Sequence, residues 1–224
     1  MDTQIANSLA HPLDVPAAIA KRRAMKSFKP DAIEPALLKR LIELTVSAPS
    51  SWNLQDWRIV MIQDEAQKAA LSEAAWGQKQ IVQAPVTFVF AADVTVGEKD
   101  LSPIHQQALQ NGALNQEAVN YLKTAIPQFQ AKLGDRRREY AIKDATIAAT
   151  HLVLAAESFG LSSCFMNGWA EEKVKAVIGA TDDLDLAIAV LVPIGYGAEE
   201  RLNPGRLPFA SNVFVDRIGN PYRG

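Results

Sequence analysis

Residues 48–57 read Ala-Pro-Ser-Ser-Trp-Asn-Leu-Gln-Asp-Trp and join two different secondary-structure patterns. Upstream, Glu34-Pro35 opens a helix, because proline suits the first helical position, and apolar residues then keep helical spacing up to Val46. Downstream, residues 57–63 are apolar and β-branched, which predicts a buried strand. The stretch between them therefore predicts a loop that is unusually rich in hydrogen-bonding side chains.

The rest of the chain alternates between the same two patterns. Apolar spacing and capping residues predict helices at 15–25, 64–76, 136–159 and 170–178, and apolar runs predict strands at 85–92, 162–166 and 184–194. The helix at 136–159 carries a stripe of small residues that lets a neighbour approach closely. Helices come first and then alternate with strands, which predicts one α+β domain over residues 1–224.

Two segments depart from this alternation. Residues 100–134 are rich in Gln, Asn and Ala, with Pro103 and Pro127 as breaks, and predict two or three short helices outside the main sheet. Residues 201–224 lack a helical period and carry the apolar run Val213-Phe214-Val215, which predicts an extended arm. An arm with no partner strand nearby in sequence invites pairing with another subunit.

Composition restricts the class of protein. The chain has 224 residues, of which 48% are hydrophobic, and its 23 basic and 25 acidic residues give a net charge of −2. That balance argues against disorder and against binding nucleic acid or an anionic membrane through global charge. One cysteine excludes an intrachain disulfide, and neither a signal peptide nor a membrane span is predicted. We expect a cytoplasmic protein.

The common catalytic and metal-binding patterns are missing. His11, His105 and His151 have no metal-ligand spacing, and Cys164 sits in an apolar strand that predicts inert packing. The Gly195-Tyr196-Gly197 triplet lacks the third glycine and the helix of a dinucleotide fingerprint. No metal site is predicted, and if the chain is an enzyme, we expect a bound cofactor to supply the chemistry.

A basic cluster stands at the end of the first predicted helix. Arg22, Arg23 and Lys26 are spaced so that Arg22 and Lys26 can converge on one anion, and the arginine fork suits phosphate. The other interpretation is that these cations only complement the helix dipole, which is worth a few tenths of a kcal/mol.

The polar loop also has two interpretations. Its Asn53 and Gln55 amides each offer donors and acceptors, which suits a flat heterocycle with mixed edges, such as the pyrimidine ring of a flavin. The alternative is a capped polar turn without a ligand.

Taken together, the motifs resemble those of the FMN-dependent nitroreductase family. The resemblance rests on four segments in order, namely Arg22-Arg23-Ala24-Met25-Lys26-Ser27-Phe28, Ala48 to Trp57, Gly160 to Trp169, and Ile194-Gly195-Tyr196 with Arg206-Leu207-Pro208 downstream. It runs from about Ala17 to Pro208.

This resemblance implies a set of cofactor-binding residues. Cations would surround the FMN phosphate and ribityl chain, with Lys26 in reach of the N1/O2 edge of the ring, and Gly195 would help bind the phosphate end. Met166, Asn167 and Gly168 would lie along the ring, with the Gly168 amide near flavin N5. Residues 49–55 would come from the partner subunit. The implied set is Arg22, Arg23, Ala24, Lys26, Pro49, Ser50, Ser51, Asn53, Gln55, Gln80, Met166, Asn167, Gly168, Gly195 and Arg206. No side chain is implied as a catalytic residue, because flavin N5 would carry the chemistry.

The resemblance also implies a fold and a reaction. The fold is a three-layer α+β homodimer with a central mixed sheet flanked by helices, active sites at the subunit interface, a variable helical lid at about 100–134 and a swapped C-terminal arm at about 201–224. The implied reaction passes electrons from NADH or NADPH through FMN to flat, electron-poor acceptors such as nitroaromatics and quinones. Trp52, Trp76, Tyr121 and Phe129 are candidates to line the acceptor slot. The alternative is an FMN reservoir or sensor without efficient turnover.

Four positions depart from the family pattern. Ala24 replaces a frequent serine, so one side-chain donor to phosphate is lost, and Asn167 stands where some members carry glutamate. Gly77 and Gln80 stand where some members carry Asn and Lys, which removes a positive charge near the expected ring.

Overall fold

A four-stranded sheet forms the centre of the computed structural model, which describes residues 12–223. The strands are β1 (Trp57–Ile62), β2 (Val86–Asp93), β3 (Ser162–Ser163) and β4 (Leu186–Gly195), in the order β1-β2-β4-β3. Every pair of neighbouring strands is antiparallel. The predicted mixed sheet is wrong for these strands, since parallel pairing within residues 12–223 is limited to one isolated bridge between Ala24 and Ser163.

Helices account for most of the remaining chain. The α-helices are α2 (Val15–Lys21), α3 (Pro35–Val46), α4 (Glu65–Ala74), α5 (Gln80–Gln83), α6 (Ser102–Gln110), α7 (Gln116–Leu133), α8 (Arg137–Ser158) and α9 (Glu171–Val177). Short 3-10 turns are η1 (Ser51–Asn53), η2 (Val96–Glu98), η3 (Gly134–Arg136) and η4 (Phe209–Ser211).

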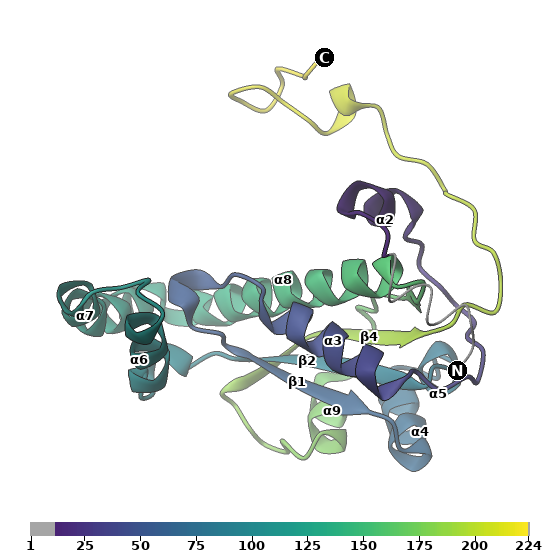
Figure 1. Cartoon of the computed structure of the whole chain (residues 1–224), viewed down its shortest axis with the longest axis horizontal. Coiled ribbons are helices and arrows are strands. Elements are labelled where there is room, and N and C mark those ends of the chain that lie inside the picture. Colours follow the sequence, from purple (N-terminus) through teal and green to yellow (C-terminus); the bar gives the residue numbers. More distant parts are fainter. Residues whose placement is uncertain (1–11, 224) are drawn as a thin grey trace.

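Two apolar clusters sandwich the sheet and give three layers (Figure 1). On one face, Phe88 and Phe90 of β2 pack with α3 and α8, whose small residues, including Ala145 and Ala148, are fully buried as the stripe predicts. On the other face, Val89 of β2 packs with α4 and α9. Side chains alternate between the faces of a strand, so a strand buried on both sides is apolar throughout.

Long-range pairing overrides the local pattern at the first helix. It was expected to run to Met25, but α2 ends at Lys21 and Arg22 adopts an extended conformation (φ −51°, ψ 129°). The reason lies elsewhere in the chain, because Met25 donates its amide to the Ser163 carbonyl at 2.9 Å and Phe28 bridges to Gly197.

The excursion at 100–134 contains the two helices α6 and α7, and the expected break at Pro127 does not occur. Pro127 lies inside α7 on an exposed position, so the Lys123 carbonyl that it leaves without an amide partner can be hydrated. Figure 1 shows α6 and α7 together beyond one end of the sheet.

The C-terminal arm is extended, as predicted, and leaves the body of the protein (Figure 1). Its secondary structure is limited to η4 and a bridge between Phe214 and Pro221. Several of its large apolar side chains are exposed, including Leu202 and Ile218, each at 85%. The expected exchange of this arm between subunits stays a prediction.

Candidate flavin site

Three of the four sequence motifs meet at one end of the sheet. Ala24 bridges to Ser163, Ser162 pairs with Gly195, and Phe28 bridges to Gly197. Residues 22–28, 162–168 and 194–197 therefore form one surface, which we call the basic half-site. It holds eight of the predicted residues or their backbone, namely Arg22, Arg23, Ala24, Lys26, Met166, Asn167, Gly168 and Gly195.

The cations of the basic half-site are only partly engaged. Arg23 donates through Nη1 to the carbonyls of Ala20 and Arg22, at 2.7 and 2.8 Å, while its buried Nε finds no partner among residues 12–223. The buried Ser163 hydroxyl likewise has no described partner. Such groups are costly to bury, so an acceptor brought in by a ligand would be stabilised here.

A hydrogen bond and an ion pair support the cations of the basic half-site. Lys26 donates from Nζ to the buried Cys164 Sγ at 3.3 Å, so the cysteine that was predicted to be packing also orients a lysine. Glu157 lies 3.9 Å from Lys21. Burial raises the pKa of Glu157, and the charges of Lys21 and its two arginine neighbours oppose that rise.

Met166, Asn167 and Gly195, which are also predicted to contact the cofactor, differ in how they are packed. Met166 is buried and bridges to Leu191, so its side chain packs in the core, whereas Asn167 is exposed. Gly195 is explained by packing, because a Cβ there would lie 2.5 Å from Pro85 Cδ. A phosphate contact by Gly195 stays a prediction.

Gln80 and Arg206 are also predicted to bind the cofactor, but neither belongs to the basic half-site. Gln80 is buried in α5 and donates to Gln78 Oε1 at 3.0 Å, and Gln78 in turn reaches the basic half-site at Gly168. Arg206 is exposed on the C-terminal arm, where Nη1 donates to the Gly205 carbonyl at 2.6 Å. Its contact with phosphate stays a prediction.

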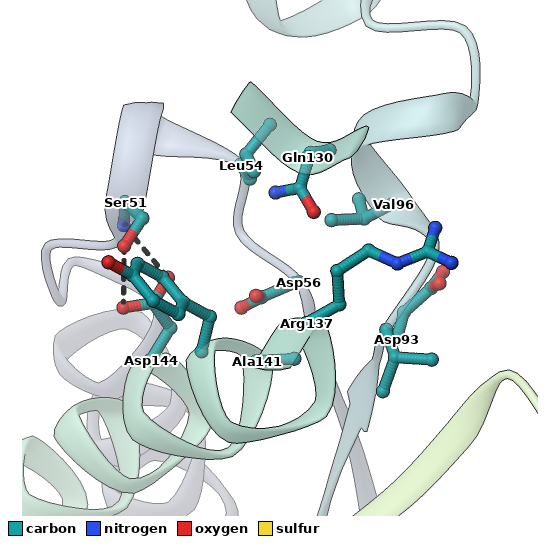
Figure 2. Close-up of a pocket in the computed structure, with 11 residues that line it drawn as sticks. Ser51, Leu54, Asp56, Asp93, Val96, Gln130, Arg137, Ala141 and Asp144 are labelled. Carbon is teal, nitrogen blue, oxygen red and sulfur yellow. Dashed lines mark hydrogen bonds between the residues drawn. The ribbon is translucent and has the colours of Figure 1, made fainter. Parts of the chain in front are cut away.

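The fourth motif forms a separate, rigid loop, which we call the polar half-site (residues 49–55). Ser51 donates its amide to Asp144 Oδ2 at 2.8 Å (Figure 2), and Ser50 Oγ accepts the Gln55 backbone amide at 2.9 Å. The two serines that were predicted to bind cofactor thus make contacts within the chain that hold the loop together. Pro49, Asn53 and Gln55 are exposed and remain available.

Backbone strain accompanies this exposure. Trp52, Asn53 and Gln55 have φ values of 56°, 55° and 50°, in the left-handed region that costs non-glycine residues on the order of 1–3 kcal/mol each. The side-chain nitrogen Nε2 of Gln55 donates to Asn53 Oδ1 at 3.4 Å, so the two side chains lie next to each other on the surface. Leu54, buried with Val96 and Ile126, anchors the loop from below.

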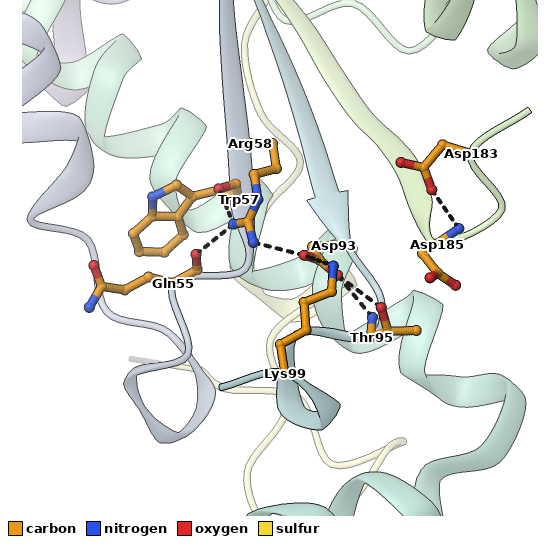
Figure 3. A network of polar contacts seen from close by, with 8 residues as sticks. All are labelled: Gln55, Trp57, Arg58, Asp93, Thr95, Lys99, Asp183 and Asp185. Carbon is orange, nitrogen blue, oxygen red and sulfur yellow. Dashed lines mark hydrogen bonds and ion pairs between the residues drawn. The ribbon is translucent and has the colours of Figure 1, made fainter. Parts of the chain in front are cut away.

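A charged network fixes the end of the loop to the sheet. Arg58 donates to the Gln55 carbonyl at 3.3 Å and to Asp93 Oδ2 at 2.7 Å, and Lys99 donates to the same carboxylate at 2.6 Å (Figure 3). The Asp93 side chain is 4% exposed, so its two cations compensate a charge that is removed from water. The position of Gln55 is therefore set by strands β1 and β2.

A small polar cavity of about 10 Å³ lies under the loop, with room for one water molecule. Asp56 and Asp144 both line it, and Asp56 Oδ1 is buried without a partner among the described residues (Figure 2). Burial, together with the Asp144 carboxylate, raises the pKa of Asp56 from 3.8 to about 7.

The two half-sites lie at opposite ends of the sheet. Val86, at the start of β2, pairs with Ile194 beside the basic half-site, whereas Ala92 near its end pairs with Trp57, directly after the polar half-site. At about 3.3 Å per residue, the strand separates them by roughly 20 Å. One chain therefore keeps its own polar half-site apart from Gly195, which follows Ile194 at the other end of the sheet.

Three of the four candidate slot aromatics gather beside the polar half-site. Trp52, Tyr121 and Phe129 line a pocket of about 390 Å³, and the rings of Trp52 and Phe129 are 5.6 Å apart. Trp76 is not part of it and packs against Gly168 instead.

Sequence reasoning missed Asp144 and Gln78. Asp144 is a buried carboxylate next to the small-residue stripe of α8, and a charge at such a position is a signal that could have been read. Gln78 carries no such signal, because its role depends on a long-range contact.

Among residues 12–223 no group of three potential ligands could hold a metal ion, and no helix there is long and apolar enough to span a bilayer.

Comparison with known proteins decides the family. Residues 19–196 match the sequence profile of the nitroreductase family. The chain belongs to the nitroreductase family.

Two relatives resemble the chain over nearly their full length. A protein named NADH dehydrogenase from Thermus thermophilus is 36% identical over 197 residues, which are 88% of this chain and 93% of the relative. A putative NAD(P)H nitroreductase, YodC of Bacillus subtilis, is 26% identical over 90% of this chain and 97% of its own length.

Solved structures agree on the fold. A putative NAD(P)H:FMN oxidoreductase from Staphylococcus epidermidis superposes with a TM-score of 0.83 at 21% identity, over 90% of this chain and 95% of that one. A putative nitroreductase from Exiguobacterium sibiricum, solved in complex with FMN, gives 0.79 at 21% identity, over 90% and 96%.

The buried Asp56 carboxyl beside the cavity under the loop predicts a pH-dependent stability. Because the pKa of Asp56 is raised on folding, the folded state keeps a proton between about pH 4 and 7 that the unfolded chain has released. The free energy of unfolding should therefore fall as pH rises through that window, by about 4 kcal/mol. Asp56→Asn should remove this decrease in the free energy of unfolding, as measured by denaturant unfolding at several pH values.

Asp31→Asn, the same change at an exposed aspartate, is the control and should keep the wild-type profile. Parallel profiles for the wild type and Asp56→Asn would contradict the burial of an unpaired Asp56 carboxyl.

Proposed function

We propose that this chain is an FMN-dependent oxidoreductase that uses NADH or NADPH to reduce flat, electron-poor acceptors such as nitroaromatics and quinones. The observation that carries the proposal is the basic half-site, in which the motif cations surround buried donors that lack an acceptor. Membership of the nitroreductase family and the names of its relatives support it, among them an FMN reductase [NAD(P)H] of Bacillus subtilis that is 29% identical over 67% of this chain.

The donor set fits the chemistry of FMN. Arg22, Arg23 and Lys26 supply the positive charge that a phosphate dianion needs, and the Arg23 Nε and Ser163 Oγ donors lack acceptors. The amides of the polar half-site fit the alternating donors and acceptors of a pyrimidine edge. When bound, FMN supplies two-electron redox chemistry between a nicotinamide and a second substrate.

The chain's own residues contribute by binding and electrostatics. Lys26, placed by the Cys164 thiol, puts a positive charge in the basic half-site, where it favours additional negative charge on a neighbouring ring. The 390 Å³ aromatic pocket has the size of a small-molecule site, and its rings favour stacking of a flat acceptor. Lys132 on its lining would attract a nitro or carbonyl oxygen.

The site is proposed to form between two copies of the chain. The basic and polar half-sites of one chain are roughly 20 Å apart, so a shared cofactor needs the polar half-site of a second copy. The exposed apolar side chains of the C-terminal arm, such as Leu207 and Phe209, also require a surface to cover them. We propose that the arm wraps the partner subunit.

The direct test of turnover is anaerobic reduction of the FMN-loaded protein. We expect either nicotinamide nucleotide to bleach the flavin absorption, and menadione or a nitroarene to restore it. A yellow protein that neither nucleotide reduces would overturn the enzyme assignment and leave an FMN reservoir or sensor.

The phosphate assignment is tested by Arg22→Ala. A hydrogen bond to a charged group is worth about 1.5–3 kcal/mol, so the Kd for FMN should rise by roughly ten- to a hundredfold, as measured by flavin fluorescence titration. Arg40→Ala removes an exposed arginine of α3 and should leave the Kd unchanged. Equal affinities for wild type and Arg22→Ala would place the phosphate elsewhere.

A further inference from the structure

A strained turn after α4 carries a glutamine back toward the basic half-site. Trp76 and Gly77 have φ values of 59° and 76°, and Gly77 donates its amide to the Ser72 carbonyl at 2.8 Å. The Ser72 hydroxyl then donates to the Gln78 carbonyl at 3.2 Å. Two consecutive left-handed residues reverse the chain, and the reversal fixes the backbone from which the Gln78 side chain extends.

The Gln78 amide is held at both ends. Its Nε2 donates to the Gly168 carbonyl at 3.0 Å, and its Oε1 accepts from Gln80 Nε2 at 3.0 Å. Gln80 is 7% exposed in α5. Because a flipped Gln78 amide would place oxygen against the Gly168 carbonyl and nitrogen against the Gln80 donor, one orientation is enforced.

Two further contacts hold the same stretch of chain. A Cβ on Gly168 would lie 2.8 Å from Trp76 Cζ3, so the indole covers the glycine Cα and excludes any side chain there. Ala170 donates its amide to the Ala74 carbonyl at 2.8 Å. Residues 74–80 therefore fix Gly168 from one side, whereas no described residue accepts its amide hydrogen.

We propose that Gln78, supported by Gln80, is a positioning residue. It holds the Gly168 carbonyl and, with the Trp76 ring against the Gly168 Cα and the Met166 amide bonded to Leu191, limits rotation about the Gly168 backbone, which keeps the Gly168 amide in place at the cofactor ring and thereby sets the redox potential of that ring. This inference rests on the FMN function proposed above. It assigns to Gln80 an indirect role, in place of the direct cofactor contact implied by the family resemblance.

The sign of the effect follows from the chemistry of a ring nitrogen. The oxidised ring offers a lone pair at N5 that accepts an amide hydrogen, whereas the reduced ring carries its own hydrogen there. A fixed donor therefore favours the oxidised form, and loosening it should move the midpoint potential to a less negative value. Preorganised donors act strongly because they need no reorganisation.

The experiment measures the midpoint potential of bound FMN in Gln78→Leu by equilibration with a reference dye. At a fixed potential, we expect the ratio of reduced to oxidised flavin to rise three- to tenfold, which is about 15–30 mV for a two-electron couple. Gln80→Leu, which leaves Gln78 in place without its support, should give a smaller shift of the same sign. FMN stoichiometry should stay at the wild-type value in both variants.

Gln83→Leu is the matched control, because it makes the same change at an exposed glutamine of α5 and should leave the potential unchanged. Should Gln78→Leu fail to fold, Gln78→Asn, which is one methylene shorter, replaces it with the same expected sign. A wild-type potential in the folded Gln78 variant, or a shift equal to that of Gln83→Leu, overturns the positioning role. Failure of the wild type to bind FMN would instead overturn the proposed function.

Discussion

The length of the antiparallel sheet is the constraint on which the rest of this structure depends. Strand β2 must pair along its whole length with β1 and β4, so the segments attached to its two ends are kept apart. The basic half-site forms where β4 ends and the polar half-site where β1 begins. The cofactor proposed above contacts both half-sites, and this separation is the reason why we propose that it binds where two chains meet.

Each half-site is prepared by residues that do not face the ligand. Asp144 of α8 holds Ser51, Cys164 orients Lys26, and Gln78 holds Gly168. These contacts order the backbone beside Asn53, the Lys26 side chain and the Gly168 carbonyl without any ligand. Because these residues are ordered when the chain folds, less conformational entropy is lost when a ligand binds, and the affinity for the ligand is higher.

Local pattern was sufficient for elements whose causes are local. The proline at the start of α3, the Asp64 cap of α4 and the apolar runs of β2 and β4 each predicted an element that the structure contains. Long-range contacts explain the rest. Strand pairing ends α2 early. Left-handed backbone brings the Gln55 amide to Ser50, and packing of α8 brings Asp144 to Ser51. The basic half-site could be assembled from motifs, but the residues behind it could not.

A subunit-mixing experiment tests the shared site most directly. Arg22→Ala damages the basic half-site and Asn53→Ala the polar half-site, so each homodimer should bind FMN weakly. After mixing and exchange of equal amounts, half of the dimers combine both variants, and each of these has one undamaged site. We expect about a quarter of all sites to regain wild-type affinity for FMN. No recovery after verified exchange would contradict a cofactor shared between two chains.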